Sequence, residues 1–225
     1  EPTIYDHRLK LARFFEQLKA TDQAEAVLRD ALKVFPENDQ AWLALADFLN
    51  MRRGKESARV ALQQAAEQLP YSTQIPFALA ALYESHKDLA EAKRVYETLA
   101  KDYARKPAGL DAEVKIAQLD FHAGRQAEAE QRLSEILRQN PRSAQGLILQ
   151  GKMALIGRNG KDAVQAFRTV LRDQPELAHV QYLLGQAYLM TGDSSLARES
   201  FERAVALQPS LVEARFALAT MESRS

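Results

Sequence analysis

The sequence predicts an all-α solenoid built from antiparallel helix pairs, and three observations carry that prediction. Prolines recur with gaps of 34, 37, 34, 34 and 34 residues. Apolar residues keep a fixed spacing before each proline, and turn signals divide each interval into two helices. A period of this size indicates a repeat array, in which each unit must stack on its neighbours to bury its apolar face. The prolines are Pro36, Pro70, Pro107, Pro141, Pro175 and Pro209.

In four of the six predicted pairs the first helix has a leucine followed by a small residue, as in Leu45-Ala46, with another large apolar residue four positions later, as in Leu49. A turn signal such as Arg53-Gly54 follows. Six pairs begin near residues 5, 39, 73, 110, 144 and 178, and an unpaired terminal helix covers 212–223.

In every pair except the third, where the proline is displaced, the second helix is recognised by counting back from the proline. Alanine stands twelve residues before it, a large apolar residue eight before, and another apolar residue five before; in the first copy these are Ala24, Leu28 and Ala31. Spacings of four and three place them on one helical face. The recurring alanine suits a close helix crossing, and the proline ends the helix because it cannot continue the hydrogen-bond ladder.

Two places break the pattern. The third pair has three extra residues, and the spacing of Tyr96, Leu99 and Tyr103 predicts a second helix about one turn longer there. Asp120 stands where other repeats have a large apolar residue, and an unpaired buried carboxylate is costly. We favour a small helix rotation that lets Leu119 and Phe121 fill the space; the alternative is a buried ion pair or a functional acid.

Composition excludes several classes of function. Hydrophobic residues make up 46% and charged residues 27%, which suits a folded core. Thirty basic and thirty acidic residues give no net charge, which argues against a nucleic-acid partner. The absence of cysteine excludes disulfides and thiolate sites. No apolar run is long enough for a membrane span. Because the chain opens Glu-Pro-Thr and its last helix exposes Phe216, Leu218 and Met221, we expect a piece of a longer protein that continues past residue 225.

No catalytic constellation is present in the sequence. The four histidines are scattered without a His-Glu-x-x-His motif, Gly160-Lys161 lacks the rest of a phosphate-binding loop, and no Gly-x-Ser-x-Gly occurs. We therefore predict a protein that is not an enzyme and that has no cofactor and no metal site.

The repeat resembles the tetratricopeptide repeat, over nearly the whole chain. The resemblance lies in patterns such as Trp42-x-x-Leu45-Ala46-x-x-Leu49, followed by Ala58-x-x-x-Leu62-x-x-Ala65 and Pro70. It implies a single array over residues 1–225 that winds into a right-handed superhelix. It also implies that the first helices line a concave groove that binds a peptide or helix of a partner protein.

The groove positions that the resemblance implies change character along the chain. In the first two repeats they are mostly polar; they are Asp6, Leu9, Arg13, Glu16, Gln17, Gln40, Leu43, Asp47, Asn50 and Met51. In the second half they form a more apolar surface, which we take as the candidate binding site, although some members could pack between neighbouring helices. Its residues are Val114, Gln118, Phe121, His122, Ile148, Lys152, Leu155, Ile156, Tyr182, Gln186, Leu189, Met190 and Phe216.

The leading hypothesis is therefore a non-catalytic scaffold for a protein or peptide partner. One alternative is a homo-oligomerisation module. Another, by analogy with bacterial proteins that carry such arrays, is a scaffold for envelope assembly or exopolysaccharide export, so the periplasm and the cytoplasm both stay open. A nucleic-acid-binding solenoid is weaker because of the zero net charge. Sugar binding by aromatic residues is weaker too, because Trp42, Tyr83 and Tyr188 occupy core positions of the repeat.

Overall fold

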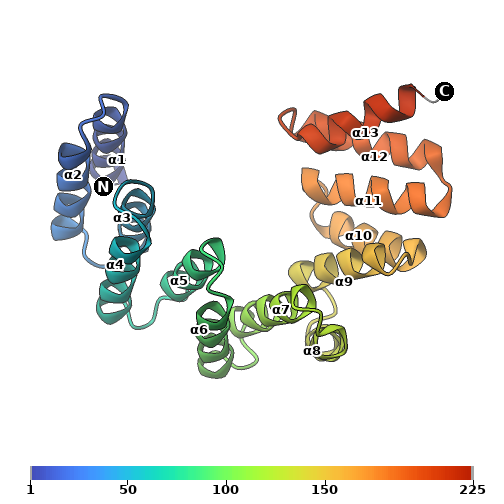
Figure 1. Ribbon diagram of the computed structural model, residues 1–225, viewed down its shortest axis with the longest axis horizontal. Coiled ribbons are helices and arrows are strands. Elements are labelled where there is room, and N and C mark those ends of the chain that lie inside the picture. The colour runs from blue at the N-terminus through green and yellow to red at the C-terminus, as the bar shows by residue number, and fades with distance from the viewer. Residues whose placement is uncertain (1, 224–225) are drawn as a thin grey trace. The chain divides into compact units, whose positions relative to one another are not determined.

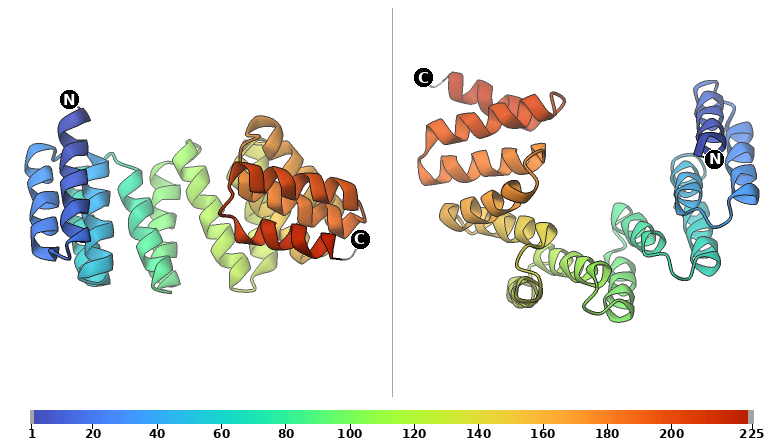
Figure 2. Two further views of the ribbon diagram at one scale, coloured as in Figure 1. Left: turned by 90° about the horizontal axis from the view of Figure 1, so that it is seen from above. Right: turned by 180° about the vertical axis from the view of Figure 1, so that it is seen from behind.

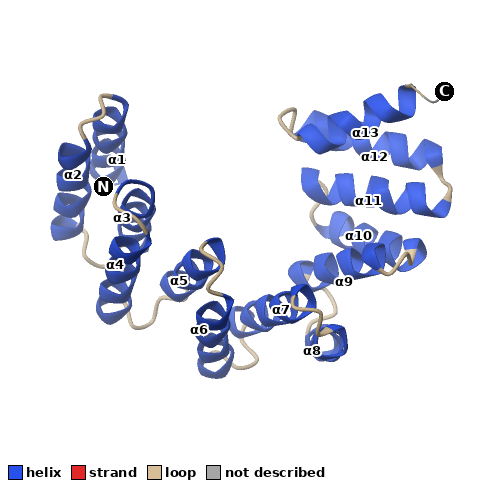
Figure 3. Ribbon diagram, in the orientation of Figure 1, coloured by secondary structure: helices blue, strands red, loops and turns tan. Residues whose placement is uncertain are grey.

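The computed structural model describes residues 2–223, with side chains described from Tyr5 onward. In this range the chain forms thirteen α-helices and no strand (Figures 1 and 3). The chain divides into two compact units, residues 1–119 and 120–225. Consecutive helices pack in pairs such as α1 with α2 and α11 with α12, as the further views also show (Figure 2). The prediction of an all-α repeat fold is confirmed.

The helix bounds follow the predicted repeat closely. Unit 1 holds α1 (Pro2–Gln17), α2 (Thr21–Val34), α3 (Asp39–Arg52), α4 (Lys55–Gln68), α5 (Gln74–Ser85), α6 (Leu89–Asp102) and most of α7 (Pro107–His122). Unit 2 holds the end of α7 with α8 (Gln126–Gln139), α9 (Ala144–Ile156), α10 (Gly160–Asp173), α11 (Ala178–Thr191), α12 (Ser194–Leu207) and α13 (Val212–Glu222). That the two units form a single array stays a prediction.

The core of each pair lies at the helix crossing. The recurring alanine of the second helix is fully buried in every copy, from Ala24 to Ala197. Two first helices of unit 2 have glycine at their own crossing position. A Cβ atom on Gly185 would lie 2.5 Å from Cε1 of Phe201, and one on Gly151 would lie 2.4 Å from Cε1 of Phe167. Both phenylalanines are fully buried, so these rings occupy the space that a side chain on the glycine would need.

Polar side chains fix several helix starts. The side chain of Asn38 accepts hydrogen bonds from the backbone nitrogens of Gln40 and Ala41, at 2.9 and 3.2 Å, which caps α3. The indole Nε1 of Trp42 donates to the carbonyl oxygen of Pro36 at 2.9 Å. The proline turn is thereby tied to the helix that follows it.

The extra residues of the third pair do not lengthen α6, so that prediction is wrong. α6 has 14 residues, like α4, whereas α7 has 16 and begins at Pro107. Proline suits the first position of a helix because its missing N–H has no intrahelical partner there. The added turn of α7 comes very close to the end of α6, since a Cβ on Gly109 would lie 2.1 Å from the carbonyl oxygen of Tyr103. Only glycine fits at this approach.

Asp120 is buried and paired, so the favoured helix rotation is also wrong. Its carboxylate is 2% exposed and accepts hydrogen bonds at Oδ1 from Nη2 of Arg125 at 2.6 Å and from Nε at 3.1 Å. Nε of Arg132 lies 3.9 Å from the other oxygen. Arg125 stands at the start of α8, so the turn after α7 brings the cation back over the carboxylate.

The terminal helix α13 exposes fewer of its apolar side chains than expected. Leu218 and Met221 pack against the core of unit 2, whereas Val212 and Phe216 are 66% and 73% exposed. Within residues 2–223 no helix is long and apolar enough to cross a membrane. In the same part of the chain, no three acidic or histidine side chains gather in a way that could hold a metal ion.

Candidate functional site

The predicted apolar surface falls mainly on one side of three first helices of unit 2. On α9, Ile148, Lys152, Leu155 and Ile156 follow helical spacing, and the same positions recur 34 residues later on α11 as Tyr182, Gln186, Leu189 and Met190. Phe216 on α13 continues the row 34 residues after Tyr182, and α9 contacts α11. We call these nine residues the C-terminal face.

The C-terminal face has an exposed part and a packed part. Ile156, Leu189, Met190 and Phe216 are 69%, 45%, 41% and 73% exposed. Ile148, Leu155 and Tyr182 instead pack against the core of unit 2 and are half-buried. The expectation that some of these residues pack between helices therefore applies to three of them, and the exposed apolar area comes from the other four.

Charged groups lie on the same three helices as the exposed apolar residues. Burial lowers the pKa of His179, and the nearby Lys152 lowers it further, while Glu213 acts against them. Burial, followed by Glu213, raises the pKa of Tyr182. The hydroxyl of Tyr182 accepts a hydrogen bond from Nε2 of Gln186 at 2.7 Å, and its ring lies 5.8 Å from that of Phe201 between centroids. Side chains from α9, α11 and α13 therefore share one electrostatic environment.

The four remaining predicted residues lie on α7. Val114 is buried, so the expectation that it is exposed to a partner is wrong. α7 is buried on several sides, with Ala112, Ile116 and Ala117 also buried. Gln118 and Phe121 are half-buried and His122 is exposed; the rings of Phe121 and His122 lie 6.2 Å apart. Their participation in binding stays a prediction.

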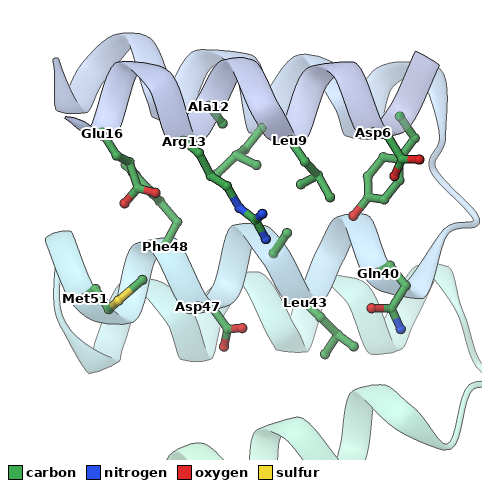
Figure 4. Close-up of a pocket in the computed structure, with 13 residues that line it drawn as sticks. Asp6, Leu9, Ala12, Arg13, Glu16, Gln40, Leu43, Asp47, Phe48 and Met51 are labelled. Atoms are coloured by element: carbon green, nitrogen blue, oxygen red, sulfur yellow. The ribbon is translucent and has the colours of Figure 1, made fainter. Parts of the chain in front are cut away.

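Unit 1 has two neighbouring cavities. One, of about 530 Å³, lies between α1 and α3 (Figure 4). A second, of about 450 Å³, lies between α3 and α5, and the two share Gln40, Leu43 and Asp47. We call the two together the N-terminal trough. Most groove positions implied for the first two repeats line it. The sequence interpretation missed Tyr5 and Phe48; the i, i+4 spacing of Tyr5 and Leu9 is the signal that could have found Tyr5.

Charge is distributed unevenly in the trough. Figure 4 shows Arg13 extending from α1 toward α3, whereas Asp47 projects from the other side of α3. Asp47 is the one charged residue among the described residues that line the second cavity. It has no ion pair or hydrogen bond within the described chain, and burial raises the pKa of its carboxyl. In the first cavity, Glu16 is 3.5 Å from Nε of Arg52.

A third cavity, of about 490 Å³, lies on a different side of α9. It is bounded by α8, α9 and the start of α10, and Gln150 and Met153 contribute from α9. Its acidic residues are already engaged: Glu130 accepts from Gln126, and Asp162 accepts from Asn159. Nothing in its lining favours one ligand chemistry.

Sequence comparison gives a consistent result. One tetratricopeptide repeat profile matches residues 114–177 and again 148–212, and a second tetratricopeptide repeat profile matches residues 6–48. Together the matched ranges span more than half of the chain. No curated protein matches the chain.

Solved structures share the fold. The type IV pilus biogenesis factor PilW is 21% identical with a TM-score of 0.63, over 96% of this chain and 98% of that one. PilF of Pseudomonas aeruginosa is 18% identical with a TM-score of 0.61, over 96% of this chain and 97% of that one. YrrB, described as having an unusual peptide-binding site, is 18% identical with a TM-score of 0.50, over 84% and 96%. At these identities the likeness concerns the fold.

Proposed function

Because the chain belongs to the tetratricopeptide repeat family, we propose that it is a non-catalytic scaffold that binds a peptide or helix of a partner protein on the C-terminal face. The exposure of Ile156, Leu189, Met190 and Phe216 on neighbouring first helices carries this proposal. Contiguous exposed apolar side chains usually mark an interaction site. Lys152, His179 and Glu213 lie on the same three helices and interact electrostatically, and they would supply the polar rim that protein interfaces have.

An amphipathic helix is the partner element that suits this face best. Its apolar side would cover exposed side chains on successive first helices, of which Ile156 and Met190 occupy the same position one repeat apart. Likeness to YrrB, a protein with an unusual peptide-binding site, supports peptide binding in general. Likeness to the pilus biogenesis factor PilW supports the alternative of envelope assembly. At 21% identity the shared feature is the fold, so the pathway is left as a prediction.

The test is a partner capture that compares the parent chain with a Leu189→Glu, Phe216→Glu double variant. Both residues are largely exposed, so the variant should keep its helical circular dichroism and its melting temperature. A matched control places glutamate at two exposed apolar positions of second helices, Val60 and Leu196, which are 42% and 41% exposed. We expect a protein that is retained by parent and control and lost by the double variant. Equal capture by all three would contradict the proposal.

The same face could instead pair with a second copy of the chain. The exposure of Phe216 and Val212 on the terminal helix favours this reading, because these two and Ile156 are the three most exposed large apolar residues of unit 2. Sedimentation equilibrium across a wide concentration range distinguishes the two. A mass that rises with concentration in the parent, and stays monomeric in the double variant, would assign the face to self-association.

A further inference from the structure

The N-terminal trough carries a second inference, independent of the C-terminal face. Its α3–α5 cavity combines an apolar floor with a set of hydrogen-bond acceptors. Leu43, Leu62 and Leu82 line it, together with Ala78 and Ala81. A lysine or arginine side chain has matching parts, because its carbon stem packs on apolar surface while its charged end stays polar.

Three polar groups of this cavity offer acceptors, whereas the side chain of Asn50 offers N–H groups, because its oxygen pairs with Nε2 of His86 at 2.9 Å. The hydroxyl proton of Ser85 is already used, since its Oγ donates to the carbonyl oxygen of Leu82 at 2.8 Å. Nε2 of Gln40 donates to Oε1 of Gln74 at 3.0 Å, which leaves the amide oxygen of Gln40 as an acceptor. Asp47 contributes a carboxylate with no partner in the described chain. The three together favour a cation.

We propose that the α3–α5 cavity receives a lysine or arginine side chain of an extended segment of a partner protein, with Asp47 as its ion-pair partner. The extended form follows from the neighbouring cavity: the α1–α3 space adjoins the first through Gln40, Leu43 and Asp47. A chain crossing α5, α3 and α1 would therefore fill both. Asp47 is exposed to solvent, so an incoming cation can reach its carboxylate, and partial burial raises the pKa of that carboxyl.

The experiment selects peptides from a phage-displayed random dodecapeptide library on four forms of the protein. These are the parent, Asp47→Asn, Asp47→Lys, and the matched control Glu97→Gln, an exposed carboxylate on α6 outside both cavities. On the parent and on Glu97→Gln we expect enrichment of lysine or arginine at one fixed position. On Asp47→Asn this enrichment should vanish, and on Asp47→Lys an acidic residue should replace the basic one.

The best peptide is then synthesised and its affinity measured by titration calorimetry. Asp47→Asn should weaken its binding about ten-fold, the usual scale of a hydrogen bond to a charged group. Replacing the peptide's basic residue by norleucine should weaken it similarly, and the double change should cost little more than either alone. Each variant is first checked by circular dichroism.

Three outcomes would overturn the inference. One is that no peptide, or no basic position, is enriched on the parent. A second is equal enrichment on Asp47→Asn. The third is that free spermidine competes as well as the peptide does, which would make the cavity a polyamine site. All of these are separable from failure of the proposed function, because Asp47→Asn leaves Leu189 and Phe216 unchanged.

Discussion

The helix crossings of the two units solve the same packing problem with different residue pairs. In the first two repeats of unit 1, an alanine on the first helix faces a leucine on the second, as in Ala46 and Leu62. In the last two repeats of unit 2, glycine corresponds to phenylalanine, as in Gly185 and Phe201. All four residues are buried. At these four crossings the summed volume of the pair is kept while the size at each single position varies. The third repeat of unit 1 departs from this, because it buries Ala80 together with the larger Tyr96.

The largest loss of stability is expected from removing the cation that pairs with the buried carboxylate of Asp120. Asp120 replaces the apolar residue that other repeats carry, such as Leu49, and is held by Arg125. Arg125→Ala should lower the free energy of unfolding by about 3 kcal/mol, because a buried carboxylate loses its main partner. Chemical denaturation measures this.

The control for that change is the double variant Asp120→Leu, Arg125→Ala, which restores an apolar pair. It should recover most of the lost stability, since the buried charge has gone. A double variant as unstable as Arg125→Ala would show that Arg125 acts through packing alone.

The next effect tests the glycine–phenylalanine pair directly. Gly185→Ala places a Cβ atom 2.5 Å from the buried ring of Phe201. We expect a loss of about 1–2 kcal/mol, although alanine is intrinsically the better helix former. Adding Phe201→Leu recreates the pair found in unit 1 and should restore part of the loss. Strict additivity of the two changes in a double-mutant cycle would contradict the idea of a shared volume.

The reverse change in unit 1 should have a smaller cost. Ala46→Gly removes a buried methyl group and weakens the helix, so it should lower the free energy of unfolding by about 1 kcal/mol. No clash is relieved, because Leu62 is smaller than phenylalanine. Thermal unfolding followed by circular dichroism should show the decrease, and an increase in melting temperature would mean that the alanine–leucine crossing is overpacked.

The smallest effect concerns the open face of unit 1. Burial raises the pKa of Asp47 in the folded chain. The folded state therefore holds this proton to higher pH than the unfolded chain, and stability falls as pH rises through the folded-state pKa. Asp47→Asn should raise the melting temperature slightly at pH 7, and the difference should shrink below about pH 4, near the ordinary aspartate value. A lower melting temperature at pH 7 would contradict this.

The repeat fold could be predicted because period and spacing depend on local packing. The same reasoning failed where one residue type serves two structural roles. Pro107 was interpreted as the end of a helix, yet it begins α7, and both positions tolerate a missing N–H. The pairing of Asp120 with Arg125 depends on the path of a turn, which residue spacing does not specify.

The candidate site was predictable only in part, because exposure depends on how much of a helix its neighbours cover. Val114 follows the groove pattern but lies on a helix buried on several sides. Leu155 and Tyr182 keep the predicted spacing and turn out to pack against the core. The cavities of unit 1 could be found only from the positions of the side chains in the structure. No pattern in the sequence indicates that Asp47 lacks a partner.

Trp42, whose indole donates a hydrogen bond to the Pro36 carbonyl, can serve as a spectroscopic probe. Trp42 is the single tryptophan of the chain and lies in unit 1. Fluorescence excited selectively at indole therefore reports the melting of unit 1 alone, whereas helical ellipticity reports both units. Transitions that coincide would indicate one cooperative molecule, and transitions that separate would indicate two. The chain thus contains its own probe for whether a ligand bound in one unit stabilises the other.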